Sequence, residues 1–155
     1  MSKSLERVAR TLRDNGMDCH PVEIGPANTA HQAAALVGCA VDQIAKSIIF
    51  RGARSGAALL FITAGGNRVA DARAAALAGE SLEKADAAFI RAQTGFVIGG
   101  VAPVGHLRPP SAFFDPRLND FGKVWAAAGT PRHVFAIAPA ALLRLSGAQA
   151  ADFAA

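Results

Sequence analysis

The sequence TGFVIGGVAPVG, residues 94–105, is the stretch around which the rest of the chain is organised. Its apolar side chains make it too apolar for a solvated loop. Its four glycines make it too flexible for a helix or a strand. We expect a loop with buried walls whose main-chain N–H groups meet a ligand, because glycine leaves those groups open to an approaching oxygen atom. Taken alone, the stretch also fits a structural crossover with glycines at tight turns.

The composition is that of a folded protein. Of the 155 residues, 52% are hydrophobic and 18% are charged, so we expect one globular domain over residues 1–155. No apolar run reaches membrane-spanning length, and residues 1–7 lack the apolar core of a secretion signal. These features predict a cytoplasmic protein with no membrane partner.

The net charge and the two cysteines only weakly restrict the partners and the chemistry of the protein. The net charge of +4 favours an anionic partner, but the basic residues are scattered and the aromatic residues are few. A bound nucleic acid would therefore be held by phosphate contacts and a pocket, not by a row of stacked rings. Cys19 and Cys39 lie far apart without CxxC spacing, so we expect free thiols, with a catalytic cysteine and a disulfide as alternatives.

Residue patterns along the chain predict short helices and short strands. Helices are expected over residues 4–14, 30–37, 72–78, 87–93 and 140–145. Strands are expected over residues 20–24, 45–50, 57–64, 111–115, 123–129 and 133–138. Thr29, Asp71 and Asp86 are the expected N-caps, and the tail after Gly147 is expected to be frayed.

The connections between the expected strands are mostly of hairpin length. This favours an α/β fold of the α+β type over a doubly wound one. We expect a mixed, largely antiparallel sheet of six to seven strands, or a barrel-like core, with short helices around it.

Lys46 occupies an unusual position in the expected strand 45–50. Alternation places it on the same face as Ile48 and Phe50. An unpaired ammonium group on an apolar face is costly. Lys46 either extends its charge into water from the start of the strand or directs a cation into a pocket, and the pattern leaves both open.

Several common catalytic sites are excluded by spacing. The four histidines show no HxH or HExxH motif, which argues against a metal site, and no GxSxG or phosphate-loop motif occurs. Asp71 and Asp115 could form a carboxylate pair, but a helix cap and a strand end explain them better. Lys46 and the glycine-rich loop remain, and this pair suits attack of water on a carbonyl group whose developing oxyanion is stabilised by amide N–H groups.

Five segments resemble the YbaK/EbsC-type aminoacyl-tRNA deacylases, whose fold also serves as the editing domain of bacterial prolyl-tRNA synthetases. The segments are TAHQAA (29–34), IAKSIIF (44–50), TGFVIGGVAPVG (94–105), FD (114–115) and AG (128–129). Their order and spacing agree along nearly the whole chain. The lysine-serine strand and the glycine-rich loop together make the resemblance specific.

The resemblance implies a YbaK-like fold and a trans-editing enzyme that hydrolyses the ester of a mischarged tRNA, typically alanyl- or cysteinyl-tRNA(Pro). It implies no metal, no cofactor and no covalent intermediate. The implied partners are the 3′ acceptor end of the mischarged tRNA and, as an optional partner, prolyl-tRNA synthetase, without DNA. Carried over by position, Lys46 would contact the terminal adenosine or the aminoacyl group, and Gly99 and Gly100 would form the main-chain site at the ester carbonyl. The implied substrate-binding residues are Ser47, Thr94, Val101, Pro103, Ala128 and Gly129.

Two segments depart from the family pattern. His31 and Gln32 stand where the family often has acidic residues, at a position expected on a helix surface. Residues 126–134 match poorly, and this leaves open which amino acid is removed, although small side chains suggest a small one. The alternative function is a non-catalytic module that binds tRNA or a synthetase on the same fold; the presence of both Lys46 and the double glycine favours the enzyme.

Overall fold

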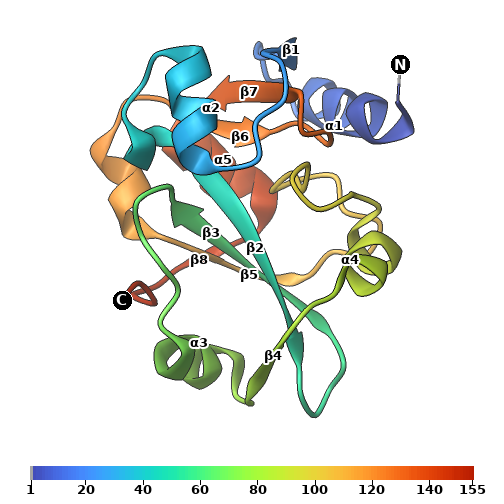
Figure 1. The fold of residues 1–155 in the computed structure, drawn as a ribbon, viewed down its shortest axis with the longest axis vertical. Coiled ribbons are helices and arrows are strands. Elements are labelled where there is room, and N and C mark those ends of the chain that lie inside the picture. The colour runs from blue at the N-terminus through green and yellow to red at the C-terminus, as the bar shows by residue number, and fades with distance from the viewer. Residues whose placement is uncertain (1) are drawn as a thin grey trace.

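The structure is a computed structural model that describes residues 2–155 (Figure 1). Its helices are α1 (Lys3–Asp14), α2 (Ala30–Val37), α3 (Asp71–Ala78), α4 (Ala87–Thr94), α5 (Pro139–Ser146) and the 3-10 helices η1 (Val41–Gln43) and η2 (Pro116–Asp120). Its strands are β1 (Val22–Glu23), β2 (Ala45–Gly52), β3 (Ala58–Ala64), β4 (Leu82–Lys84), β5 (Ser111–Phe114), β6 (Val124–Ala127), β7 (His133–Ile137) and β8 (Gln149–Ala150).

The larger sheet has five strands in the order β4-β2-β3-β5-β8. β2 and β3 form the predicted antiparallel hairpin, in which Lys46 lies opposite Thr63. β5 pairs in parallel with β3, and β8 pairs in parallel with β5. Every residue of β3 is buried, as its continuous apolar sequence predicts.

The smaller sheet has three antiparallel strands in the order β1-β7-β6. It lies with α1 at one end of the molecule, whereas α3 and β4 lie at the other end (Figure 1). A single parallel bridge between Ile44 and Trp125 joins β6 to the start of β2. The β6–β7 hairpin therefore lies beside the part of β2 that carries Lys46.

The mixed α/β prediction is confirmed, but the barrel-like alternative is wrong. Residues 2–155 form two separate sheets and no closed barrel. The expected strand count was also low, because β4 and β8 have only three and two residues and lack a recognisable alternation. No helix in this part of the chain has the length and apolar character needed to cross a membrane.

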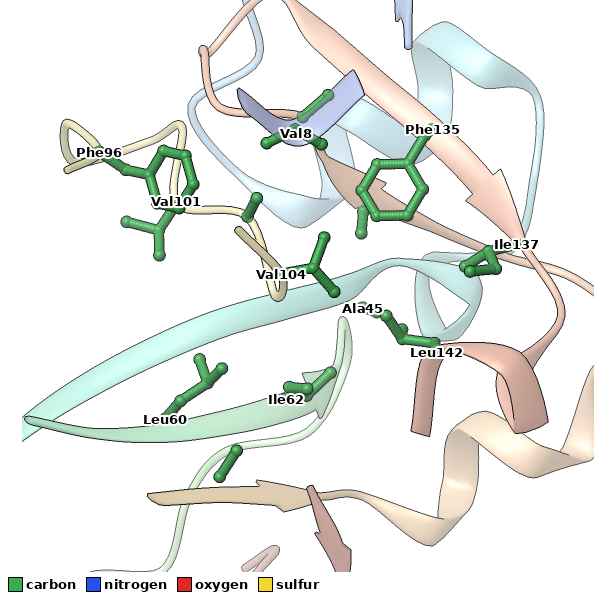
Figure 2. Packing of buried hydrophobic residues seen from close by; sticks show 14 of the residues in the cluster. Val8, Ala45, Leu60, Ile62, Phe96, Val101, Val104, Phe135, Ile137 and Leu142 are labelled. Atoms are coloured by element: carbon green, nitrogen blue, oxygen red, sulfur yellow. The ribbon is translucent and has the colours of Figure 1, made fainter. Parts of the chain in front are cut away.

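The main hydrophobic core collects side chains from α1, both strands of the β2–β3 hairpin, β7, α5 and the glycine-rich loop. Figure 2 shows residues of this core from each of these elements, namely Val8, Ala45, Leu60, Ile62, Phe96, Val101, Val104, Phe135, Ile137 and Leu142. Phe96, Ala102 and Val104 of the loop are buried almost completely. The loop has the buried walls that its composition predicts.

The tail after Gly147 is ordered, which contradicts the expected fraying. Phe153 is fully buried, and its ring lies 5.0 Å from that of Phe61, measured between centroids. The carbonyl oxygen of Phe153 accepts a hydrogen bond from the Ala70 N–H at 2.8 Å. The buried Phe153 ring, main-chain hydrogen bonds and the pairing of β8 with β5 together fix a segment made otherwise of small and polar residues.

The N-cap predictions are confirmed at two of three positions. The Thr29 hydroxyl accepts a hydrogen bond from Gln32 N–H, and the Asp86 carboxylate accepts one from Phe89 N–H. Asp71 is not a cap, because α3 begins at Asp71 itself and Ala70 occupies the cap position. The Ala70 N–H at the cap position is bonded to the C-terminal tail.

Candidate active site

A cavity of about 690 Å³ opens between the two sheets. Its walls are the segment that leads into α2, the first half of β2, residues 65–68, part of the glycine-rich loop and the β6–β7 hairpin. Many of the lining residues are small, including Ala27, Ala33, Ala45, Ala126 and Ala127. The size falls within the range typical of small-molecule sites.

Lys46 lines this cavity from β2. Its Nζ atom donates a hydrogen bond to the carbonyl oxygen of Gly65 at 3.2 Å. Burial lowers the pKa of the Lys46 ammonium group, and the positive charge of Arg68 lowers it further, whereas Asp115 and Asp42 act in the opposite direction. The chain thus places a partly desolvated cation at the cavity wall.

Two carboxylates hold the turn that carries the Gly65 carbonyl. Asp42 Oδ1 accepts a hydrogen bond from Gly66 N–H at 2.8 Å. Asp115 Oδ2 accepts one from Ala64 N–H at 3.0 Å and one from the Asn67 side chain at 2.9 Å. Asp115 is also the N-cap of η2, as expected for a strand-end residue. These bonds fix the carbonyl that orients Lys46.

The glycine-rich loop reaches the cavity through Ile98, Gly99 and Val101. The Gly100 N–H donates to the Val97 carbonyl oxygen at 3.0 Å, so it is occupied within the loop. Within residues 2–155, no acceptor pairs with the main-chain N–H of Ile98, Gly99 or Val101. The three loop residues that line the cavity, Ile98, Gly99 and Val101, therefore all have main-chain N–H groups without a protein acceptor in the described residues.

At Gly100, glycine is required by close packing and not by access of a ligand to its N–H group. A Cβ atom built on it would lie 2.7 Å from Thr130 Cα, which is too close for any side chain. The absent side chain lets the loop pack directly on the main chain of the β6–β7 turn. Gly100 therefore joins two walls of the cavity.

The β6–β7 hairpin contributes polar groups that the sequence analysis missed. Thr130 and His133 both line the cavity, and the Thr130 hydroxyl lies 2.7 Å from His133 Nδ1. Trp125 lines it too, with the Lys123 ammonium 5.2 Å from its ring centroid. The sequence signal for this site was His133, a polar residue at the start of an otherwise apolar strand that follows the Thr130-Pro131 turn.

Comparison with known proteins identifies the family. The family model described as "Aminoacyl-tRNA editing domain" matches residues 25–145. The chain belongs to this family. It is 30% identical over 118 residues to the uncharacterized protein YwhH of Bacillus subtilis (strain 168), which corresponds to 76% of this chain and 74% of YwhH.

Solved structures agree with this editing-domain assignment. A crystal structure of "a putative trans-editing enzyme for prolyl tRNA synthetase" is 44% identical, with a TM-score of 0.92 over 100% of this chain and 99% of that chain. The crystal structure of the hypothetical protein APE2540 is 25% identical, with a TM-score of 0.88 over 96% of this chain and 99% of that chain. The resemblance stated from the sequence motifs is confirmed.

The editing domain brings four of the nine predicted site residues to the cavity, which are Lys46, Ser47, Gly99 and Val101. Ser47 follows Lys46 on β2, and its hydroxyl oxygen is buried and has no hydrogen-bond partner within residues 2–155.

The other five predicted residues do not line the cavity. Thr94 is buried at the end of α4, where its hydroxyl donates to the Ile90 carbonyl at 2.6 Å. Ala128 lies in the main core, and Gly129 packs against the main chain of Ser4. Their neighbours Ala127 and Thr130 line the cavity instead. The remaining two are Gly100 and Pro103.

His31 requires a correction. The sequence predicts it on the surface of a helix, where the departure from the family pattern would affect the pocket little. It is exposed, but it also lines the cavity from the first turn of α2. The departure from the family pattern at this position therefore bears on the mouth of the site.

The two cysteines are free, as expected. Both are half-buried, and burial is the main cause that raises the pKa of each thiol. Neither lines the cavity. Residues 2–155 also contain no group of three or more metal-ligating side chains close enough to share an ion.

Proposed function

We propose that this protein is a trans-editing aminoacyl-tRNA deacylase that hydrolyses the ester of a mischarged tRNA. The observation that carries the proposal is the meeting of the Lys46 side chain and the unpaired N–H groups of Gly99 and Val101 at one cavity. Membership of the editing family supports the reaction class. Residues 1–155 would act as a single editing domain.

The chemistry follows from the groups available. The ester carbonyl oxygen would face the Gly99 and Val101 N–H groups, which stabilise the negative charge that develops there. Lys46 would hold the terminal adenosine or the aminoacyl group in place. A water oxygen bonds to the carbonyl carbon, the bond to the ribose oxygen breaks, and a proton from the water ends on that ribose oxygen. This route requires no metal, no cofactor and no covalent intermediate.

This proposal modifies the assignment of Gly99 and Gly100 as the main-chain donors. The Gly100 N–H is already bonded to Val97. Val101, which the resemblance implies only as a substrate-binding residue, has an unpaired N–H and lines the cavity. We therefore assign the donor pair to Gly99 and Val101, with Gly100 as the residue that sets their spacing from Thr130.

The size of the cavity favours a single terminal nucleoside with a small amino acid attached. A volume of about 690 Å³ accommodates that unit but no helical part of a tRNA. We propose alanyl- or cysteinyl-tRNA(Pro) as the substrate. The 44%-identical protein is described as acting for prolyl tRNA synthetase, and we extend this partner to the present chain as an optional one, in the cytoplasm.

The test is a deacylation assay with a panel of tRNAs. Alanyl- and cysteinyl-tRNA(Pro) are the candidate substrates, and prolyl-tRNA(Pro) and alanyl-tRNA(Ala) are the matched controls. We expect release of amino acid from at least one mischarged tRNA above spontaneous hydrolysis, and little release from prolyl-tRNA(Pro). Binding of the panel without release from any member would instead indicate a non-catalytic tRNA-binding module.

A further inference from the structure

Helix α1 lies outside the residues matched by the family model, yet it contacts both ends of the glycine-rich loop. Arg7 provides the main contact. Its Nε atom donates to the Gly105 carbonyl oxygen at 2.6 Å, and its Nη2 atom donates to the Thr94 carbonyl oxygen at 3.2 Å. Residues 94 and 105 are the two ends of the stretch that carries the proposed donors.

The same guanidinium also packs on the loop. Its carbon atom lies 4.7 Å from the centroid of the Phe96 ring, and Phe96 is fully buried. Figure 2 shows Phe96 and Val101 of the loop in the same core as Val8 of α1. One side chain thus fixes the start, the end and a buried anchor of the loop.

Among the described residues, no carboxylate pairs with the Arg7 guanidinium. Its hydrogen-bond acceptors are the two loop carbonyls. A planar guanidinium suits this arrangement because its fork bonds two separate acceptors, which the single ammonium of lysine does less well.

Other hydrogen bonds hold the two flanks of the loop. Phe96 N–H donates to the Thr94 hydroxyl at 3.0 Å, His106 Nε2 lies 2.6 Å from the Ala102 carbonyl oxygen, and Leu107 N–H donates to the Thr94 carbonyl oxygen at 3.1 Å. The middle of the loop has less support. Between Phe96 and Ala102, its main chain makes one internal hydrogen bond, from Gly100 N–H to Val97. The N-terminus of α1 adds a second fastening, because the Ser4 hydroxyl donates to the Gly95 carbonyl at 3.0 Å. The main chain of Ser4 also packs against Gly129, beside the turn that Gly100 touches. α1 therefore contacts both walls that flank the cavity.

We propose that Arg7 is a positioning residue that holds the Gly99 and Val101 N–H groups at the spacing needed to bind the reacting carbonyl oxygen. This inference rests on the proposed function. It extends the site to a helix that contributes no atom to the cavity lining.

The test compares Arg7→Met and Arg7→Lys with Arg10→Met, a matched control at an exposed arginine on the same helix. We expect Arg7→Met to lower kcat for the best mischarged tRNA by about tenfold with KM nearly unchanged, because the donors act mainly on the transition state. The kcat of Arg7→Lys should lie between that of Arg7→Met and that of the wild type. Arg10→Met should have the kcat of the wild type.

A second measurement separates positioning from stability. In Arg7→Lys we expect shifted amide NMR signals for Gly99 and Val101 and faster hydrogen exchange at Gly100, with unchanged exchange in β2 and β3. If Arg7→Met does not fold, the Arg7→Lys variant decides. An Arg7→Lys variant with wild-type kcat and unchanged loop signals would overturn the inference. A wild-type protein inactive on every tRNA would instead count against the proposed function, and the NMR comparison would still test the role of Arg7.

Discussion

The Lys46 ammonium nitrogen lies 3.2 Å from the Gly65 carbonyl oxygen, and both residues line the same cavity. The carbonyl belongs to a turn held by Asp42 and Asp115. Lys46 is therefore a cation with a fixed direction at the wall of the cavity. Its charge is stabilised by a dipole and by two nearby carboxylates, not by a direct ion pair.

Replacement of Lys46 by alanine should lower activity and leave the fold intact. We expect kcat/KM for the mischarged tRNA to fall by about tenfold or more, since an orienting charge is lost. The matched control is Lys84→Ala, an exposed lysine on β4. Unfolding by denaturant would check stability, and normal turnover by the Lys46 variant would exclude this residue from the mechanism.

The pH profile should report the pKa of Lys46. Burial lowers that pKa below its usual value, so the fraction of ammonium falls as the pH rises through the lowered pKa, and activity should fall with it. The negative charge of Asp115 opposes this shift. Asp115→Asn should therefore move the alkaline limb of the rate profile to still lower pH.

The control for this profile is Asp152→Asn, an exposed carboxylate that pairs with Arg73. Rates must be corrected for spontaneous ester hydrolysis at each pH. An alkaline limb that stays in place, or moves upward, in Asp115→Asn would contradict the proposed electrostatic link to Lys46.

Gly100→Ala should destabilise the protein by forcing the loop away from the β6–β7 turn. The added Cβ would lie 2.7 Å from Thr130 Cα. We expect a loss of roughly 1–3 kcal/mol in the free energy of unfolding, typical of overpacking. Gly122→Ala is the control, because no atom lies within 4 Å of its added Cβ. Equal unfolding midpoints for the two variants would refute the close contact.

Phe153→Ala should show that the C-terminal segment is part of the fold. Its ring is fully buried against Phe61. We expect a loss of about 3–5 kcal/mol on removing a buried phenylalanine. Leu36→Ala, at a leucine that is 50% exposed, should change stability little. A Phe153 variant as stable as the wild type would mean that the tail is frayed after all.

The sequence predicted features that depend on neighbouring residues. Thr29 and Asp86 cap helices because their oxygen atoms reach an N–H group a few residues on. The β2–β3 hairpin follows from two apolar runs joined by a polar turn. Lys46 was recognised because a charge on an apolar strand face is costly anywhere.

Features set by distant contacts were missed. Asp71 is the first residue of α3 and not its cap, and Ala70, at the cap position, bonds to Phe153, which lies far along the chain. Gly100 looked like an open ligand site, but its lack of a side chain serves a contact with Thr130. The strands on either side of residues 130–132 were predicted, but whether His133 lines the cavity depends on how the β6–β7 hairpin lies against the start of β2.

The most direct test of the central claim is an NMR titration with a non-hydrolysable analogue, in which an amide replaces the ester of 3′-alanyl-adenosine. We expect the amide signals of Gly99 and Val101 and the side-chain signal of Lys46 to shift together, with one common saturation curve. Saturable binding that shifts other residues and leaves these three signals unchanged would contradict the claim that the lysine and the loop act on the same ester.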